Sequence, residues 1–225
     1  MMQTQVSSLH QARLDTVLGA LESRAARRVL DLGCGPGPLL ERLLESGVAE
    51  ALTAIDISAE AIERLRRRFG REPRLRLIHG SFTDRDHRLQ GFDAAVMLET
   101  IEHLPPDRLS QVEQALFAFH RPRLVLITTP NADCNRLLGV PDGCFRRPDH
   151  RFEWGRDRFR RWAEGVAQRN GYSVSVTGIG PEHPRYGSPS QLAEFVEARA
   201  EMSHASAQRP STPNPSLTAS FQEEP

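Results

Sequence analysis

Two glutamates and a histidine stand close together in the run LETIEHLPP, where they could bind a metal ion. Glu99, Glu102 and His103 are spaced i, i+3 and i+4, so a single helical turn would carry all three on one face. Carboxylate oxygens and an imidazole nitrogen aimed at one point suit a divalent cation. A fourth ligand from a distant part of the chain would complete such a site.

A glycine-rich turn, DLGCGPG, follows an apolar strand expected over 29–32 and opens a helix expected over about 39–46. Such a turn lets backbone approach a ligand closely at the carboxyl end of a sheet. Its spacing is G-x-G-x-G with Asp31 before it, which differs from the G-x-G-x-x-G of dinucleotide-binding domains. Asp56 ends the next strand, where its carboxylate could accept hydrogen bonds from both hydroxyls of a ribose.

The elements that must position these residues alternate along the chain. Apolar strands are expected over about 29–32, 51–56, 75–82, 92–98 and 123–131. Helical segments are expected over about 9–23, 39–46, 59–69, 107–119 and 159–170. Two further strands, about 172–180 and 190–198, would form an antiparallel pair after Gly171 stops the last helix. The pattern predicts an α/β fold with a mostly parallel, doubly wound sheet and helices on both faces.

Length and composition limit the classes of protein to consider. The 225 residues suffice for one α/β domain, expected over 1–202, followed by a disordered Ser/Pro/Ala-rich tail over 203–225. The 29 basic residues, all arginine, balance 29 acidic ones, so any RNA-binding surface must be local. The chain shows no secretory signal or apolar span, and its three cysteines are not spaced like a zinc motif. We expect a cytoplasmic monomer that does not contact membranes.

The glycine turn and the two acids resemble those of class I S-adenosylmethionine-dependent methyltransferases. Proteins of that class have a Rossmann-like, seven-stranded sheet that ends in an antiparallel pair, which agrees with the strands counted above. The resemblance implies S-adenosylmethionine as cofactor, with its amino-acid end, ribose and adenine held in that order. The residues that it assigns to these three parts are Asp31, Gly33 and Gly35, then Asp56, then Ser81 and Phe82.

A second motif, RPDHRFEW, places His150 in an arginine-rich insertion after the fifth strand. Together LETIEHL, TTPNADCN and DHRFEW resemble the small-RNA 3′-terminal 2′-O-methyltransferases, the Hua-enhancer family and its bacterial RNA-repair relatives. The resemblance implies methyl transfer to the 2′-hydroxyl at an RNA 3′ end, with an RNA end-repair protein as a possible partner. It makes Glu99, Glu102, His103 and His150 both the metal ligands and the catalytic residues. Two imidazoles and two carboxylates favour Mn²⁺ over Mg²⁺.

The chemistry agrees with this resemblance. A ribose 2′-hydroxyl is a weak nucleophile at neutral pH, and a divalent cation lowers its pKa. Only the last nucleotide has free hydroxyls at both 2′ and 3′, so chelation of that pair would select RNA ends. The general base stays open among His103, Glu99 and water.

The insertion could also contact RNA directly. Arginines between 146 and 161 could bind phosphates, and Phe152 or Trp154 could stack on a base. The alternative is a solvated arginine face with both aromatic rings in the core, and for Trp154 we favour the core. Asn131 is a candidate to line the pocket.

Two other functions remain open. The Glu–Glu–His cluster also occurs in ubiquinone-pathway enzymes, so the chain could be a metal-dependent O-methyltransferase for catechol-like diols. The arginine-rich insertion argues against that substrate. An inactive RNA-end-binding module is the second alternative, and the intact acids at positions 31, 56, 99 and 102 argue against it.

Overall fold

The computed structural model describes residues 2–198, and the side chains from Ser8 onward. Seven strands form one sheet in the order β3-β2-β1-β4-β5-β7-β6. Their bounds are Arg28–Leu32 (β1), Ala51–Asp56 (β2), Leu75–His79 (β3), Ala94–Leu98 (β4), Leu124–Pro130 (β5), Tyr172–Ile179 (β6) and Ser190–Glu197 (β7). β1 to β5 are parallel, and β7 runs antiparallel to both β5 and β6. The predicted sheet and its terminal antiparallel pair are confirmed.

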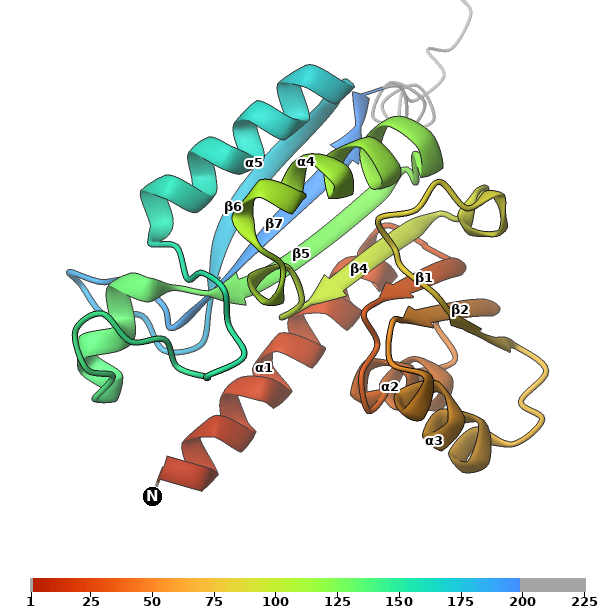
Figure 1. Ribbon diagram of the computed structural model, residues 1–225, viewed down its shortest axis with the longest axis horizontal. Coiled ribbons are helices and arrows are strands. Elements are labelled where there is room, and N and C mark those ends of the chain that lie inside the picture. Colours follow the sequence, from red (N-terminus) through yellow and green to blue (C-terminus); the bar gives the residue numbers. More distant parts are fainter. Residues whose placement is uncertain (1, 199–225) are drawn as a thin grey trace, which may run out of the picture.

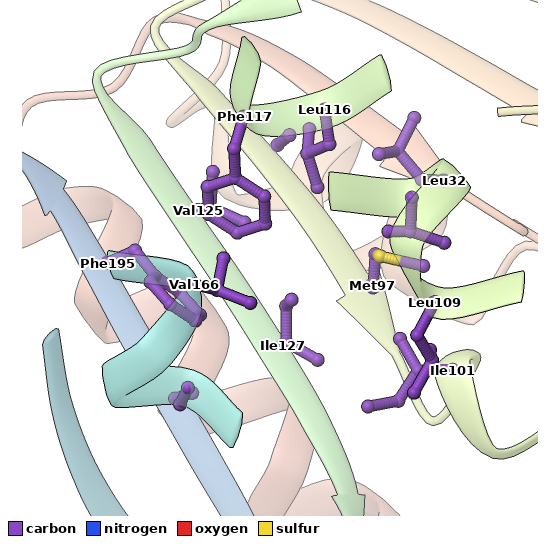
Figure 2. Close-up of a cluster of buried hydrophobic side chains, with 14 of the residues drawn as sticks. Leu32, Met97, Ile101, Leu109, Leu116, Phe117, Val125, Ile127, Val166 and Phe195 are labelled. Atoms are coloured by element: carbon purple, nitrogen blue, oxygen red, sulfur yellow. The ribbon is translucent and has the colours of Figure 1, made fainter. Parts of the chain in front are cut away.

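Helices cover both faces of the sheet (Figure 1). The main helices are α1 (Met2–Ser23), α2 (Pro38–Ser46), α3 (Ala59–Phe69), α4 (Leu109–Val112) and α5 (Arg156–Asn170). One buried cluster joins the sheet to α1 and α2, and a smaller one joins it to α2 and α3. On the opposite face, the largest cluster packs the sheet against α4, α5 and the π-helical segment η4 (Glu113–His120). Figure 2 shows its centre, where Phe117, Val125 and Ile127 are fully buried.

Local signals in the sequence explain where several elements begin and end. The Ser58 hydroxyl accepts a hydrogen bond from the Ala61 amide at 3.2 Å, which caps α3 as expected. Gly171 adopts a left-handed conformation with φ 75° and ends α5.

The helix expected over 107–119 is divided into different helical types. Its start is a 3₁₀ turn at Pro106–Arg108, then α4, then the wider η4 segment. From η4, the ring of Phe117 packs edge-on against Phe195 and Tyr172. The wider π-helical geometry of η4 thus occurs where an aromatic side chain packs into the core. Helical periodicity in the sequence does not predict it.

The carboxyl ends of β1, β4 and β5 meet at one edge of the sheet, because these three strands are parallel neighbours. The insertion after β5 begins with the 3₁₀ segment η5 (Ala132–Leu138) and returns to the same edge. There Asn131 and Trp154 form a parallel bridge. The fold therefore brings the glycine turn, the segment after β4 and the insertion to a common edge.

Two further expectations concern the C-terminal tail and membrane-spanning helices. The tail predicted over 203–225 lies outside the described residues. Within the described part of the chain, no helix has both the length and the apolar character needed to cross a bilayer.

Candidate active site

Three of the four predicted metal ligands come together at this edge. Glu102, His103 and His150 each offer one ligand atom, and these atoms all lie within 4.8 Å of one another. The two imidazole rings stand nearly perpendicular with their centroids 4.9 Å apart. The segment after β4 supplies Glu102 and His103, while the insertion after β5 supplies His150. Residues nearly fifty positions apart in the chain thus form one donor cluster.

Glu102 is fully buried, and only one of its carboxylate oxygens is satisfied. Its Oε2 accepts a hydrogen bond from the Thr129 hydroxyl at 3.1 Å, whereas Oε1 has no partner among the described residues. Burial raises the pKa of Glu102 well above its usual range, and the nearby charge of Glu99 raises it further. A buried carboxylate oxygen without a hydrogen-bond partner is costly. A divalent cation beside Oε1 would remove that cost, so the residues present fit a metal ion.

A buried acid orients His150. The Nδ1 atom of His150 lies 2.6 Å from Glu153 Oε1, and both side chains are almost inaccessible. Glu153 also accepts hydrogen bonds from the Asn135 side-chain amide at 2.6 Å and the Arg146 backbone amide at 2.8 Å. Burial alone would raise the pKa of Glu153, but these hydrogen bonds hold it below its usual value. A carboxylate on one ring nitrogen leaves the other nitrogen to coordinate metal.

No role for Glu153 was predicted from the sequence. Its position three residues after His150 in DHRFEW was the available signal.

His103 is the more accessible histidine of the cluster. Its Nδ1 lies 3.5 Å from Asp149 Oδ2. Burial lowers the pKa of His103, and the nearby Asp149 partly offsets that effect. A neutral imidazole at pH 7 is the form that binds metal.

Glu99 does not join the other three residues in this structure. The 3₁₀ turn spans only Ile101–His103, and Glu99 precedes it with a left-handed backbone, φ 51°. Its Oε2 lies 2.8 Å from Arg13 Nη2, and its Oε1 accepts a hydrogen bond from Ser190 Oγ at 3.0 Å. The expectation that one helical turn carries all three LETIEH residues is therefore wrong, because the turn begins after Glu99. Its assignment as a ligand remains a prediction.

The two predicted cofactor acids lie beside the glycine turn. Asp31 is 3 % exposed, and its Oδ2 has no partner among the described residues. Burial raises the pKa of Asp31 to about 7, and Asp56 contributes a smaller increase. The carboxylate of Asp56 accepts hydrogen bonds from the Gly35 and Ser58 amides, both at 2.8 Å. A cationic ammonium group would suit Asp31.

The glycine turn adjoins the metal-ligand segment. Gly33 has φ 78°, and a Cβ atom there would lie 2.5 Å from the Thr100 side chain and 3.5 Å from Phe82. Gly35 has φ 51° and faces open space. The Ser81 hydroxyl lies 2.6 Å from that of Thr83. Gly33 thus touches both the predicted adenine neighbour Phe82 and the segment that carries Glu102.

The arginine-rich insertion is partly structural. Arg146 donates to the Asn135 side chain at 2.7 Å and to the backbone oxygens of Pro189 and Asn131. It therefore braces the insertion, which corrects the interpretation of Arg146 as a phosphate contact. Trp154 is 6 % exposed, so its expected place in the core is confirmed, and Phe152 is also buried.

Asn131, the candidate to line the substrate pocket, is buried. Its side-chain amide donates to the carbonyls of Tyr186 and Ser188. With Arg156 and Arg160 it lines a small cavity of about 60 Å³.

The sheet order, the glycine turn after β1 and the acid that ends β2 together define a Rossmann-like methyltransferase. Residues 29–123 match the family described as "Methyltransferase domain". Many solved structures of this class share the fold.

Similarity over nearly the whole domain narrows the class to one family. The methyltransferase domain of bacterial CtHen1 is 39 % identical with a TM-score of 0.76, over 84 % of this chain and 99 % of that one. The small RNA methyltransferase HEN1 is 30 % identical with a TM-score of 0.79, over 85 % and 26 %. The small RNA 2′-O-methyltransferase of Xenopus tropicalis is 37 % identical, over 86 % and 56 %. The chain belongs to the Hen1 methyltransferase family. It spans about half the length of the curated vertebrate relatives it matches.

Proposed function

We propose that this chain transfers a methyl group from S-adenosylmethionine to the 2′-hydroxyl of the 3′-terminal nucleotide of RNA, with the help of a divalent cation. The cluster of Glu102, His103 and His150 next to the glycine turn is the observation that carries this proposal. Family membership supports it, because the matched relatives are named small RNA 2′-O-methyltransferases.

The cofactor end of the site depends on two acids with different environments. Asp31 is buried, and its Oδ2 has no hydrogen-bond partner among the described residues. Its carboxylate would pair with the ammonium group of the cofactor. Asp56 would accept hydrogen bonds from the ribose hydroxyls. Gly33 and Gly35, both with positive φ, keep the turn free of side chains at this place. These predicted cofactor residues adjoin the segment after β4, since Gly33 lies beside Thr100.

The substrate end depends on the donor cluster. Glu102, His103 and His150 would hold the cation, and Glu153 would fix the ring orientation of His150. When bound, the cation supplies positive charge that lowers the pKa of a ribose hydroxyl and orients it. Two imidazoles in the donor set favour Mn²⁺ over Mg²⁺. Proximity between the hydroxyl and the methyl group supplies a further part of the rate.

Recognition of the terminal diol explains why the site would act on RNA ends. A 3′-phosphate or a terminal 2′-deoxyribose lacks one of the two vicinal hydroxyls. A catechol carries a similar diol, so a small-molecule O-methyltransferase is the second candidate function. The exposed arginines of the insertion, among them Arg147 and Arg151, favour RNA over a neutral phenol. Cooperation with an RNA end-repair protein remains a prediction.

The test measures methyl transfer from labelled S-adenosylmethionine, with Mn²⁺, to short RNAs that differ only in the last sugar. We expect label in the RNA with both terminal hydroxyls and none in the 3′-phosphate or 2′-deoxy RNAs. Chelator should stop the reaction, and Mn²⁺ should restore it. Labelling of a catechol but of none of the RNAs would establish the second candidate instead.

Variants connect that activity to the cluster. Glu102→Gln should bind S-adenosylmethionine normally but lose Mn²⁺ binding and at least about 100-fold in transfer rate, because it removes a charged ligand. His150→Ala should behave alike. Glu164→Gln on the exposed side of α5 is the matched control and should keep full activity. Full activity of Glu102→Gln would contradict the metal assignment.

A further inference from the structure

The carboxylate of Glu99 is held by a side chain of the N-terminal helix. Arg13 of α1 places Nη2 2.8 Å from Glu99 Oε2, and its Nε donates to Ser190 Oγ at 3.1 Å. Ser190 Oγ in turn lies 3.0 Å from Glu99 Oε1. These three residues form a closed network in which both oxygens of Glu99 have a partner.

The network is well shielded from solvent. The side chains of Arg13 and Glu99 are 12 % and 18 % exposed, and Ser190 is fully buried. Ser190 is also within hydrogen-bonding distance of the backbone oxygen of Thr129 at 3.1 Å. Such pairs are screened by water much less than surface pairs. The Arg13–Glu99 contact is thus stronger than an ordinary surface ion pair.

Glu99 and Arg13 act electrostatically on the donor cluster as well as on each other. The negative charge of Glu99 raises the pKa of Glu102, while the positive charge of Arg13 lowers it. Two carboxylates near each other repel unless a cation lies between or beside them. In the structure, Arg13 supplies that positive charge from the α1 side of the sheet.

We propose that Arg13 is a positioning residue that serves as a built-in counter-cation: it holds Glu99 apart from Glu102, His103 and His150 and competes with a divalent cation for the Glu99 carboxylate. This inference rests on the metal site proposed above. Metal binding would recruit Glu99 as a further ligand and release Arg13. The helix α1 would thereby adjust how tightly the site binds metal.

The alternative explanation is a structural tie, in which the ion pair of Arg13 only stabilises the packing of α1 against the sheet. The chain offers a matched control for it, because Arg24 near the C-terminal end of α1 pairs with Glu194 of β7 at 2.7 Å. A structural tie predicts that loss of either arginine lowers stability by the same amount with and without metal. A competing counter-cation predicts different behaviour for Arg13 alone.

The experiment measures Mn²⁺ affinity by calorimetric titration, and melting temperature with and without saturating Mn²⁺, on the full chain. Arg13→Met should bind Mn²⁺ roughly five-fold more tightly than the wild type, a difference of about 1 kcal/mol, because its ion pair no longer competes for the Glu99 carboxylate. Its melting temperature should fall without Mn²⁺ and recover when Mn²⁺ is saturating. Arg24→Met should keep the wild-type Mn²⁺ affinity within two-fold and lose stability equally in both conditions.

A second variant covers the case in which Arg13→Met does not fold. Arg13→Gln keeps hydrogen-bond donors near Ser190 but removes the charge, and it too should bind Mn²⁺ more tightly. Unchanged or weaker Mn²⁺ binding in these variants, while Glu102→Gln abolishes binding, overturns this inference and leaves the proposed function intact. Absence of Mn²⁺ binding by the wild-type protein overturns both.

Discussion

The environment of Asp31 decides how the cofactor end of the site responds to pH. Burial raises the pKa of this carboxyl from 3.8 to about 7, and Asp56 adds to the shift. An acid whose pKa is raised by folding destabilises the folded protein as pH rises from the unfolded value toward the folded one. The isolated protein thus carries a proton on Asp31 below about pH 7, and its stability falls between pH 3.8 and about 7, where the unfolded chain has already lost that proton.

Affinity for S-adenosylmethionine should therefore rise with pH through about 7. The cofactor ammonium needs the charged form of Asp31, so binding below that pH must release a proton and should weaken about ten-fold per pH unit. Calorimetric titration between pH 5.5 and 8.5 measures this slope. Asp31→Asn should bind weakly with a flat profile. An equally steep profile in that variant would assign the titration to another group.

Several residues of the site could be predicted from spacing, and others could not. Glu102, His103 and His150 were chosen by residue type and motif, and the fold does bring them together. The roles of Glu153 and Arg13 could not be predicted from the sequence. They depend on which side chains face each other at the sheet edge once the chain has folded. Arg146 illustrates the opposite error: an arginine in a basic segment indicates RNA binding, whereas in the folded protein its side chain donates to three acceptors of the protein itself.

At the level of elements, the insertion after β5 is the part of the fold that places His150. Arg146 braces it, with a side chain only 13 % exposed. Alternation of apolar strands and helices was enough to predict the sheet, because the parallel strands β1, β2, β4 and β5 are buried on both faces. The spacing of apolar residues gave no information about the π-helical segment η4. It also did not predict that the 3₁₀ turn carrying Glu102 and His103 begins after Glu99. Such turns are set by a few tertiary contacts rather than by repeated apolar spacing.

Arg146→Met should destabilise the protein by about 2 kcal/mol, because it removes three hydrogen bonds to part-buried acceptors. It should also weaken Mn²⁺ binding, since Arg146 Nε holds the Asn135 side chain, Asn135 donates to Glu153, and Glu153 orients His150. Urea unfolding and metal titration measure the two effects. Arg136→Met, at an exposed position of the same insertion, is the control and should change stability by less than about 0.5 kcal/mol. Equal effects of the two changes would contradict the bracing role.

On the scale of the whole molecule, two layers of helices leave one edge of the sheet to carry both halves of the site. α1 belongs to the layer with α2 and contacts β4 and β6 (Figure 1). The predicted cofactor residues lie beyond β1 and β2, whereas the donor cluster lies beyond β4 and β5. In the proposed function, this arrangement would bring the methyl donor and the acceptor together. The charge of the molecule is the remaining global property, and its 29 basic and 29 acidic residues cancel.

A neutral molecule should bind RNA through few phosphates, so its activity should depend weakly on salt. Each phosphate contact on single-stranded nucleic acid contributes about −0.7 to the slope of log affinity against log salt. With about two contacts, KM for a short RNA should rise roughly seven-fold between 50 and 200 mM salt. Arg151→Gln, which removes an exposed charge of the insertion, should raise KM and reduce the slope, whereas Arg64→Gln on α3 should leave both unchanged. A rise of more than about 100-fold would instead require an extended basic surface, which a balanced charge distribution does not predict.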